Sequence, residues 1–265
     1  MASIKDFLYD DKEEKLNEIQ NRISKRKRRF KLFKRCFISL LLLLGILYFI
    51  SDYSKVKSLR VENNVYYSQE DILKKADLSY NTRHLLVPTF YIEHILGEDP
   101  LIKEVDVNKN IQGNITIKVK EEKVIGYLAK DNKNITILLG NGKTFDLDIK
   151  YLSNIIYLPY LSEFTTKELK ELAHAFNRKG KEVDQSIISS ISDIKPFTTS
   201  YDQHMIKIWM QDGNRIYSSL KGIPLLNTYK KVLEKIETTP LKGSNVCLWA
   251  DELNASYTAS KQNCP

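Results

Sequence analysis

Few side chains in this sequence have a type and spacing that could do chemistry. Cys247, in the segment Asn-Val-Cys-Leu-Trp, is the one candidate thiol nucleophile, and it would need a histidine and an arginine brought close to it by the fold. No Gly-x-Ser-x-Gly sequence is present, so the usual signal for a serine nucleophile is missing. A structural thiol on a strand is the simpler interpretation. A membrane-anchored extracellular enzyme that acts on the cell wall, with Cys247 as its nucleophile, is kept as the alternative.

Metal and phosphate chemistry lack their usual residue spacings. None of the four histidines lies in a His-x-x-x-His pair, and the cysteines form no Cys-x-x-Cys pair, so no zinc site is expected. The segment Gly142-Lys143-Thr144 is similar to the end of a phosphate-binding loop, but that loop needs a glycine where this chain has Ile137. Asn141 and Gly142 instead favour a β-hairpin turn. The sequence therefore predicts no metal ligand, no cofactor and no catalytic residue.

The strongest signal in the chain is a basic run followed directly by an apolar block. Residues 25–35 are rich in Lys and Arg, and residues 36–50 carry no charge and include five consecutive leucines. Residues 33–53 reach the length of a membrane-spanning helix if Lys34 and Arg35 extend to the membrane interface. The positive-inside rule then places the N-terminus in the cytoplasm and everything after residue 53 on the outer side.

Two other interpretations of the apolar block are weaker. A buried core helix would have to be apolar on every face, which few soluble domains can accommodate. A cleaved signal peptide would need a small-x-small site, and residues 51–55 read Ser-Asp-Tyr-Ser-Lys. We therefore expect an uncleaved signal anchor, which makes the chain a single-pass type II membrane protein.

The excess of positive charge belongs to the segment that flanks the membrane. The net charge is +8, but residues 1–35 hold 12 Lys and Arg against 6 Asp and Glu, which leaves only +2 for the rest. Such a distribution argues against nucleic acid as a partner of the outer part. The part of the chain after the anchor contains two cysteines, Cys247 and Cys264, and the sequence leaves open whether they form a disulfide.

The first stretch after the anchor has the pattern of a small sheet covered by two helices. Alternating apolar residues predict strands around residues 59–61, 101–107 and 115–119. Ser68 with Asp71 three positions later predicts the start of one helix, and residues 89–97 predict a second. The order is therefore strand, helix, helix, strand, strand, in which the last two strands form a hairpin and the first strand joins them.

These segments are similar to the POTRA domain of the bacterial FtsQ/DivIB cell-division family. The resemblance rests on the segments VKSLRVENNVYYSQEDILKKADLS and LIKEVDVNKNIQGNITIKVKEEKVIGYL, which lie in the family's order behind a single anchor. It implies an α+β protein with an N-terminal transmembrane helix, a POTRA domain and a larger mixed β-sheet domain with helices. The expected parts are a cytoplasmic tail (1–32), the transmembrane helix (33–53), the POTRA domain (54–122) and the extracytoplasmic β domain (123–265).

The second domain shows alternating strands and two amphipathic helices. Strands are expected at residues 124–129, 135–139, 144–147 and 205–210, and helices at residues 166–179 and 223–237. Two last extended segments are expected at residues 244–249 and 253–259. This composition is consistent with the family's β-rich second domain.

The resemblance implies a non-enzymatic scaffold of the bacterial divisome, located at the division septum. Its expected partners are the membrane, FtsL-like and FtsB/DivIC-like coiled-coil proteins and the septal peptidoglycan synthases. The expected mode is addition of a partner strand to an exposed sheet edge near the C-terminus. A different POTRA protein, such as an outer-membrane assembly factor, would need repeated POTRA units and a barrel, for which this length leaves no room.

The implied partner-binding residues fall in two places. Family members often carry a Val-Asp-Leu-Arg-like strand where this chain has Val-Cys-Leu-Trp, which departs from the pattern. The first helix of the POTRA domain offers a second docking surface. The candidates are Val246, Leu248, Trp249, Leu253, Ala255, Tyr257 and Ala259 in the last two segments, and Tyr66, Tyr67 and Glu70 in the POTRA domain. Core packing is an equally good explanation for Trp249 and Tyr257.

Overall fold

A computed structural model describes residues 28, 30–200, 204–242, 245–260 and 264–265. Most of the predicted tail, and the predicted strand start at Ser244, lie outside these residues. The chain forms two compact units. One unit contains the described part of Met1–Lys57 together with Tyr80–Val87, and the other contains Ser58–Ser79 together with the described part of Pro88–Pro265.

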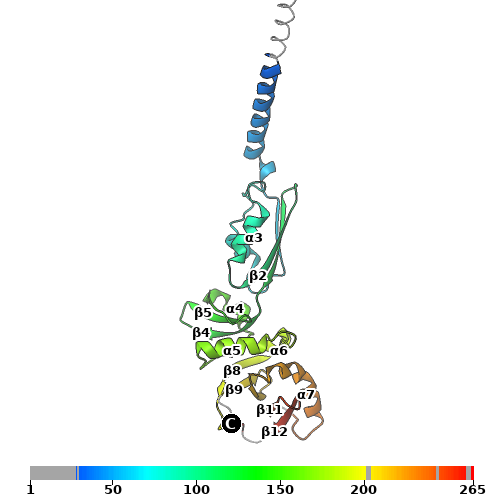
Figure 1. The fold of residues 1–265 in the computed structure, drawn as a ribbon. Helices are drawn as coiled ribbons and strands as arrows, with labels where there is room; N and C mark the ends of the chain where they lie inside the picture. Colours follow the sequence, from blue (N-terminus) through cyan, green and yellow to red (C-terminus); the bar gives the residue numbers. More distant parts are fainter. Residues whose placement is uncertain (1–27, 29, 201–203, 243–244, 261–263) are drawn as a thin grey trace, which may run out of the picture. The chain divides into compact units, whose positions relative to one another are not determined.

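The first unit is built around the apolar helix Phe30–Ile50 (Figure 1, blue). Its 21 residues span roughly 30 Å at 1.5 Å per residue, which matches the hydrocarbon thickness of a bilayer. None of its most apolar stretch is buried by the rest of the protein. A 3₁₀ turn, η1 (Asp52–Ser54), follows the helix. The helix therefore has the length, composition and exposure of a membrane anchor.

The second unit begins with the small α+β sheet expected from the sequence. Strands β1 (Ser58–Glu62), β2 (Ile102–Lys109) and β3 (Asn114–Glu121) lie in the order β1-β3-β2. β1 is parallel to β3, whereas β2 and β3 form the antiparallel hairpin. Helices α2 (Gln69–Lys75) and α3 (Thr89–Gly97) bury Ile72, Ile92 and Leu96. A capping box of Ser68 and Asp71 starts α2, as the sequence predicts.

A nine-stranded mixed sheet forms the rest of this unit, in the order β12-β11-β10-β9-β8-β7-β4-β5-β6. Helix α5 packs on β5 and on the turn η3, and Figure 1 shows these elements from green to red. The α+β fold class is therefore confirmed. The strands are β4 (Val124–Ala129), β5 (Asn134–Leu139), β6 (Thr144–Asp148), β7 (Tyr160–Leu161), β8 (Ile191–Phe197), β9 (Met205–Met210), β10 (Arg215–Ser219), β11 (Cys247–Asp251) and β12 (Ser256–Ser260). The helical elements are η2 (Ile149–Tyr151), α4 (Leu152–Ile155), α5 (Thr166–Phe176), α6 (Gln185–Ile188), η3 (Ile223–Thr228) and α7 (Tyr229–Glu237).

Two sequence expectations need correction at the C-terminal end. The single helix expected over residues 223–237 is a 3₁₀ stretch followed by α7, and Pro224 lies at the start of the 3₁₀ stretch. The extended segment expected from Leu253 begins at Ser256 instead. Asp251 Oδ1 accepts hydrogen bonds from the backbone N–H groups of Leu253 and Asn254, at 3.0 and 3.2 Å, and so closes a turn there.

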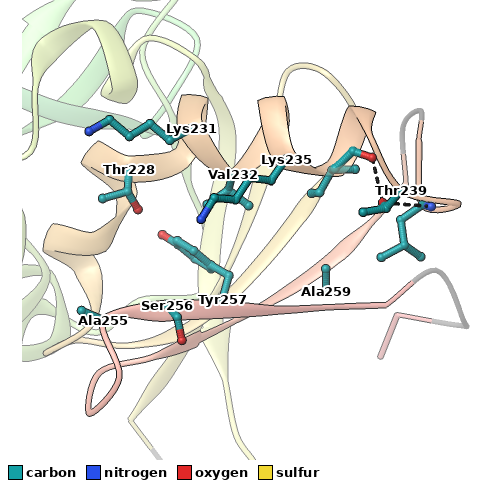
Figure 2. A pocket seen from close by; sticks show the side chains of 11 residues that line it. Thr228, Lys231, Val232, Lys235, Thr239, Ala255, Ser256, Tyr257 and Ala259 are labelled. Carbon is teal, nitrogen blue, oxygen red and sulfur yellow. Dashed lines mark hydrogen bonds between the residues drawn. The ribbon is translucent and has the colours of Figure 1, made fainter.

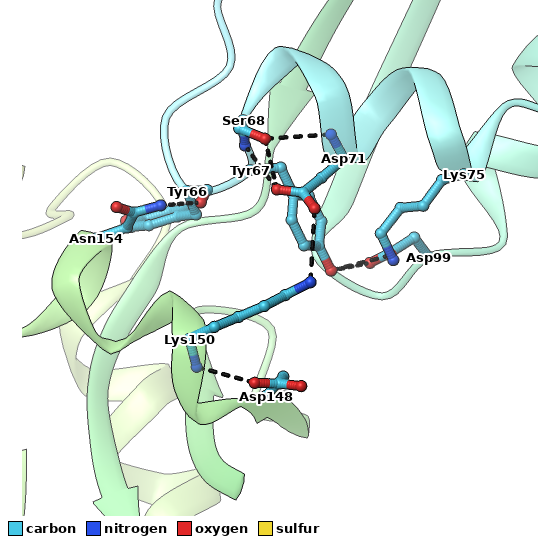
Figure 3. A network of polar contacts seen from close by, with 9 residues as sticks. All are labelled: Tyr66, Tyr67, Ser68, Asp71, Lys75, Asp99, Asp148, Lys150 and Asn154. Carbon is cyan, nitrogen blue, oxygen red and sulfur yellow. Dashed lines mark hydrogen bonds and ion pairs between the residues drawn. The ribbon is translucent and has the colours of Figure 1, made fainter. Parts of the chain in front are cut away.

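The small sheet and the large sheet meet through a group of polar and aromatic contacts (Figure 3). Asn154 Nδ2 donates a hydrogen bond of 2.9 Å to the backbone oxygen of Tyr66. The rings of Tyr67 and Tyr151 make an edge contact at 5.5 Å between centroids. Lys150 Nζ lies 3.7 Å from Asp71 Oδ1. These contacts join α2 and the segment before it to η2 and α4.

Candidate functional site

The described sheets end in four edge strands, and only one of them lacks charged residues. β1 carries Arg and Glu, β2 carries Lys, Glu and Asp, and β6 carries two Asp residues. β12, with the sequence Ser-Tyr-Thr-Ala-Ser, has no charge and no proline. Charges and prolines on an edge strand discourage pairing with another chain. β12 is therefore the edge best suited to accept a partner strand.

The two last strands place their side chains on two faces of the sheet. β12 pairs antiparallel with β11, with Leu248 opposite Ala259 and Trp249 opposite Thr258. β11 in turn pairs parallel with β10, with Tyr217 beside Trp249. Because neighbours along a strand point to opposite faces, Leu248 and Ala259 share one face and Trp249 and Thr258 share the other.

Asn214 fixes where β11 begins. Its side chain is buried, and its Oδ1 accepts a 3.0 Å hydrogen bond from the backbone N–H of Val246. Its Nδ2 donates to the hydroxyl oxygen of Tyr229 at 2.9 Å. That hydroxyl donates to Asp212 Oδ2 at 2.6 Å, and burial is the main cause that raises the pKa of Tyr229. The β9–β10 turn, the first residue of α7 and the start of β11 are thus held together.

A groove of about 420 Å³ lies between α7 and the last strand. Figure 2 shows Tyr257 between β12 and α7, with Val232 and Lys235 on the helix above it. The hydroxyl oxygen of Tyr257 is buried and has no hydrogen-bond partner among the described residues. Burial also raises the pKa of Tyr257. The groove is lined by Thr228, Lys231, Val232, Lys235, Ile236, Thr239, Leu241, Ala255, Ser256, Tyr257 and Ala259.

The opposite face of the sheet carries a cluster of aromatic rings. Tyr217 and Trp249 stack with centroids 4.5 Å apart and an interplanar angle of 17°. Phe197 meets Trp249 edge-on at 6.2 Å. Trp249 is half-buried, so it contributes to core packing and also presents part of its ring to the surface. Both interpretations of this residue therefore have support.

A disulfide joins Cys247, on β11, to Cys264, next to the C-terminus, with their Cα atoms 5.6 Å apart. The pairing that the sequence left open is thus present in the structure. The last residue, Pro265, is held in place by two donors to its backbone oxygen, the hydroxyl of Tyr217 at 2.5 Å and Nζ of Lys207. In this state Cys247 is buried and carries no thiol, so the nucleophile assigned to it in the alternative hypothesis is absent.

The structure separates the predicted C-terminal candidates into three groups. Val246 and Leu248 are buried, and contribute to the core rather than to a surface. Leu253 and Ala255 lie in the turn between β11 and β12, where Leu253 is 96% exposed and Ala255 has a φ of 48°. Tyr257 and Ala259 lie on β12 and line the groove.

The three candidates predicted in the first domain after the anchor differ in their exposure. Tyr66 and Tyr67 are buried, and the hydroxyl of Tyr67 donates to Asp99 Oδ2 at 3.0 Å. The backbone N–H groups of both residues donate to the carboxylate of Glu121. These two tyrosines are structural residues and are not accessible for docking, which corrects the expectation for them. Glu70 is exposed.

Sequence reasoning missed the contribution of α7 to this region. Lys231 and Lys235, one helical turn apart, rim the groove, and Val232 lines it between them. The repeat of two lysines at i and i+4 beside an apolar residue was the available signal. Nothing in the sequence places this helix next to β12, because the contact depends on the order of strands in the sheet. Within the described part of the chain, no group of three or more His, Cys, Asp or Glu residues could hold a metal ion.

The chain is similar to a known domain family and to known proteins. The family model "POTRA domain, FtsQ-type" matches residues 54–122. The chain is 28% identical over 239 residues to cell division protein DivIB of Bacillus anthracis, covering 85% of this chain and 87% of that protein. It is 26% identical over 234 residues to cell division protein DivIB of Bacillus subtilis, and this match covers 85% of this chain and 86% of that protein.

A solved structure was also matched. It is the major extracytoplasmic domain of DivIB from Geobacillus stearothermophilus. The match covers 45% of this chain and 98% of the solved chain, with 15% sequence identity and a TM-score of 0.33. This TM-score is too low for the fold to be inferred from the match.

Proposed function

We propose that the chain is a member of the FtsQ/DivIB family of bacterial cell-division proteins and acts as a non-enzymatic scaffold of the divisome. It spans the membrane once through the helix Phe30–Ile50 and presents its POTRA and β domains on the outer side. The basic run that precedes the helix supports this orientation, because Lys and Arg are retained on the cytoplasmic side. The proposed location is the division septum.

The observation that carries the proposal is the uncharged, singly paired edge strand β12. A row of backbone N–H and C=O groups on such an edge can bind an extended segment of a partner as one more strand. The backbone pairing supplies affinity, and the alternating side chains of the added strand supply specificity. The proposed partners are FtsL-like and FtsB/DivIC-like coiled-coil proteins, through which the septal peptidoglycan synthases are coupled to the assembly.

The groove beside β12 gives the partner strand a chemical requirement. Every second side chain of an added strand lies on the face that carries Tyr257 and Ala259, next to α7. Val232 and Ile236 form an apolar floor, whereas Lys231 and Lys235 are exposed on the rim. An apolar side chain that fills the groove, followed by an acidic side chain beside the lysines, would match these features.

Substitution of the edge strand tests the mode of binding. Thr258 on β12 and Thr144 on β6 are both exposed threonines on edge strands of the same sheet. We expect Thr258→Lys to weaken binding of the extracytoplasmic part of the FtsB/DivIC-like protein at least tenfold, because a charge on the edge opposes strand addition. The matched control, Thr144→Lys, should bind as the wild type does. Affinities are measured by biolayer interferometry on the full chain in nanodiscs.

The charge requirement is tested separately. Lys231→Glu reverses one rim charge without touching the sheet, and it should weaken the same interaction and reduce its dependence on salt. Lys179→Glu, at an exposed lysine outside the groove, is the control. Unchanged affinity in both Thr258→Lys and Lys231→Glu would show that neither β12 nor the groove takes part in binding.

A further inference from the structure

We infer that the loop Tyr80–Val87 is a second membrane contact, which inserts Leu85 and Leu86 into the lipid interface beside the anchor helix. This inference rests on the anchor helix being in a bilayer. It does not depend on the partner proposed above or on which side of the membrane the domains lie. The occupant of this surface is the lipid bilayer itself.

Hydrogen bonds hold the loop at the end of the helix. Arg83 Nη1 donates to the backbone oxygen of Ser51 at 2.8 Å and to the hydroxyl oxygen of Ser54 at 2.7 Å. The backbone N–H of His84 donates to the backbone oxygen of Ser54 at 3.0 Å. The backbone N–H of Val56 donates to Thr82 at 2.9 Å, and Lys55 and Arg83 form a β-bridge. All of these residues belong to the same compact unit as the helix.

The distance along the chain from the helix to these contacts is short. The helix ends at Ile50, and the backbone N–H of Ser51 still bonds to Leu47 and Tyr48. A 3₁₀ helix rises about 2.0 Å per residue, so the three residues of η1 advance only about 6 Å. The headgroup region on each side of a bilayer is roughly 5–8 Å deep. A loop bonded to Ser51 and Ser54 is therefore held at the depth of the headgroups.

The loop exposes apolar side chains at this depth. Leu85 is 53% exposed and Leu86 is 63% exposed, and neither belongs to the core of the protein. Tyr80 and Tyr53 are exposed in the same unit, and tyrosine is enriched where membranes meet water. Lys57 Nζ lies 5.9 Å from the ring centroid of Tyr53, which adds a cation to this group. Two adjacent leucines, two tyrosines and basic residues are the composition of an interfacial lipid-binding segment.

Site-directed spin labelling of the full chain in nanodiscs tests this inference. In a Cys36→Ser background the only described cysteines are those of the disulfide, so a single introduced cysteine carries the nitroxide. Leu86→Cys and Leu85→Cys replace exposed side chains and leave the loop's hydrogen bonds intact. We expect the label at either position to collide more often with oxygen, which partitions into lipid, than with a water-soluble nickel chelate.

Two controls make the outcomes distinguishable. Ile46→Cys lies in the anchor helix and must show the lipid pattern, otherwise the anchor itself is not inserted. Leu253→Cys, at a highly exposed leucine in the β11–β12 turn, should show the aqueous pattern. The inference is overturned if the labels at positions 85 and 86 behave like the one at 253 while the label at 46 is in lipid. Protection of positions 85 and 86 from both reagents would also overturn it, because that pattern indicates cover by protein.

Discussion

At the scale of single residues, Asn214 determines the position of the last two strands. Replacement by Ala leaves the buried N–H of Val246 without its acceptor and removes the donor to the Tyr229 hydroxyl oxygen, which keeps its bond to Asp212. An unsatisfied buried polar group costs about 1–3 kcal/mol, so Asn214→Ala should lower the free energy of unfolding by that amount. Urea denaturation monitored by circular dichroism measures the difference. The control, Asn254→Ala, removes an exposed asparagine and should change the free energy of unfolding by less than about 0.5 kcal/mol. Equal losses of stability in the two variants would contradict the structural role assigned to Asn214.

Glu121 gives a prediction about pH. Burial, opposed by the N–H donors of Tyr66, Tyr67 and Val65, raises the pKa of its carboxyl above 4.5. Between pH 4.5 and the raised pKa, the folded protein therefore binds a proton that the unfolded chain has released. The contribution of Glu121 to stability is largest at the low end of this window and falls as pH rises through it. The fall is at most about 1.4 kcal/mol per pH unit.

Comparison with Glu121→Gln isolates this effect, because the variant has no titrating group at that position. The stability difference between wild type and variant, measured by denaturation from pH 4.5 to 7, should become less favourable to the wild type as pH rises. A difference that grows with pH would mean that the three donors lower the pKa instead. Burial also lowers the pKa of Lys123, which is close in sequence to Glu121. Lys123 is present in both proteins, so its titration does not enter the difference between them.

The burial of Tyr66 and Tyr67 shows what residue patterns cannot reveal. The two tyrosines precede a helix cap and look like surface residues in the sequence. The segment that carries them is held beside β3 by Glu121, more than 50 positions later, which accepts hydrogen bonds from their backbone N–H groups. No local pattern encodes a contact of that range. The cap of Ser68 and Asp71, in contrast, is a local interaction, and the sequence predicted it correctly.

At the scale of elements, the disulfide makes the β11–β12 hairpin part of a closed loop. Cys247 and Cys264 are 17 residues apart. A crosslink that closes a loop of about 15 residues stabilises a fold by about 3 kcal/mol. Reduction of the wild type should therefore lower the denaturation midpoint by a corresponding amount, whereas Cys264→Ser should show the lower midpoint with or without reductant. The paired protein, unfolded without reductant, should show one titratable thiol, that of Cys36, and three titratable thiols would contradict the pairing.

Alternation and turn chemistry predicted most elements of the large sheet. The predicted hairpin at Asn141-Gly142 is present because its signal is local. The pairing of β10 with β11 is parallel and needs a crossover through η3 and α7. Such a connection leaves no signal in either strand, so the groove between α7 and β12 could not be derived from the sequence. The family resemblance supplied the location of the proposed binding edge, not the geometry of the groove.

At the scale of the whole molecule, the contacts between the two sheets predict coupled unfolding. Asn154 and Tyr151 bind the segment around Tyr66 and Tyr67. The wild type should therefore unfold in one calorimetric transition of this unit. The double variant Asn154→Ala, Tyr151→Ala removes both contacts and should separate the transition into two. As a control, Asn134→Ala alters a half-buried side chain away from the junction and should leave one transition. Two transitions in the wild type would show that the sheets unfold independently.

The order of strands has a consequence for the time at which the protein becomes functional during its synthesis. β12 ends five residues before the C-terminus, and the disulfide that closes its hairpin uses the penultimate residue. A chain is synthesised and exported from its N-terminus, so its anchor enters the membrane long before the proposed binding edge exists. A chain interrupted before residue 247 would end its sheet at β10 and lack the proposed docking strand. Recruitment of the proposed partner through β12 would thus require that the chain has been made at least as far as Cys264 and that this part has crossed the membrane.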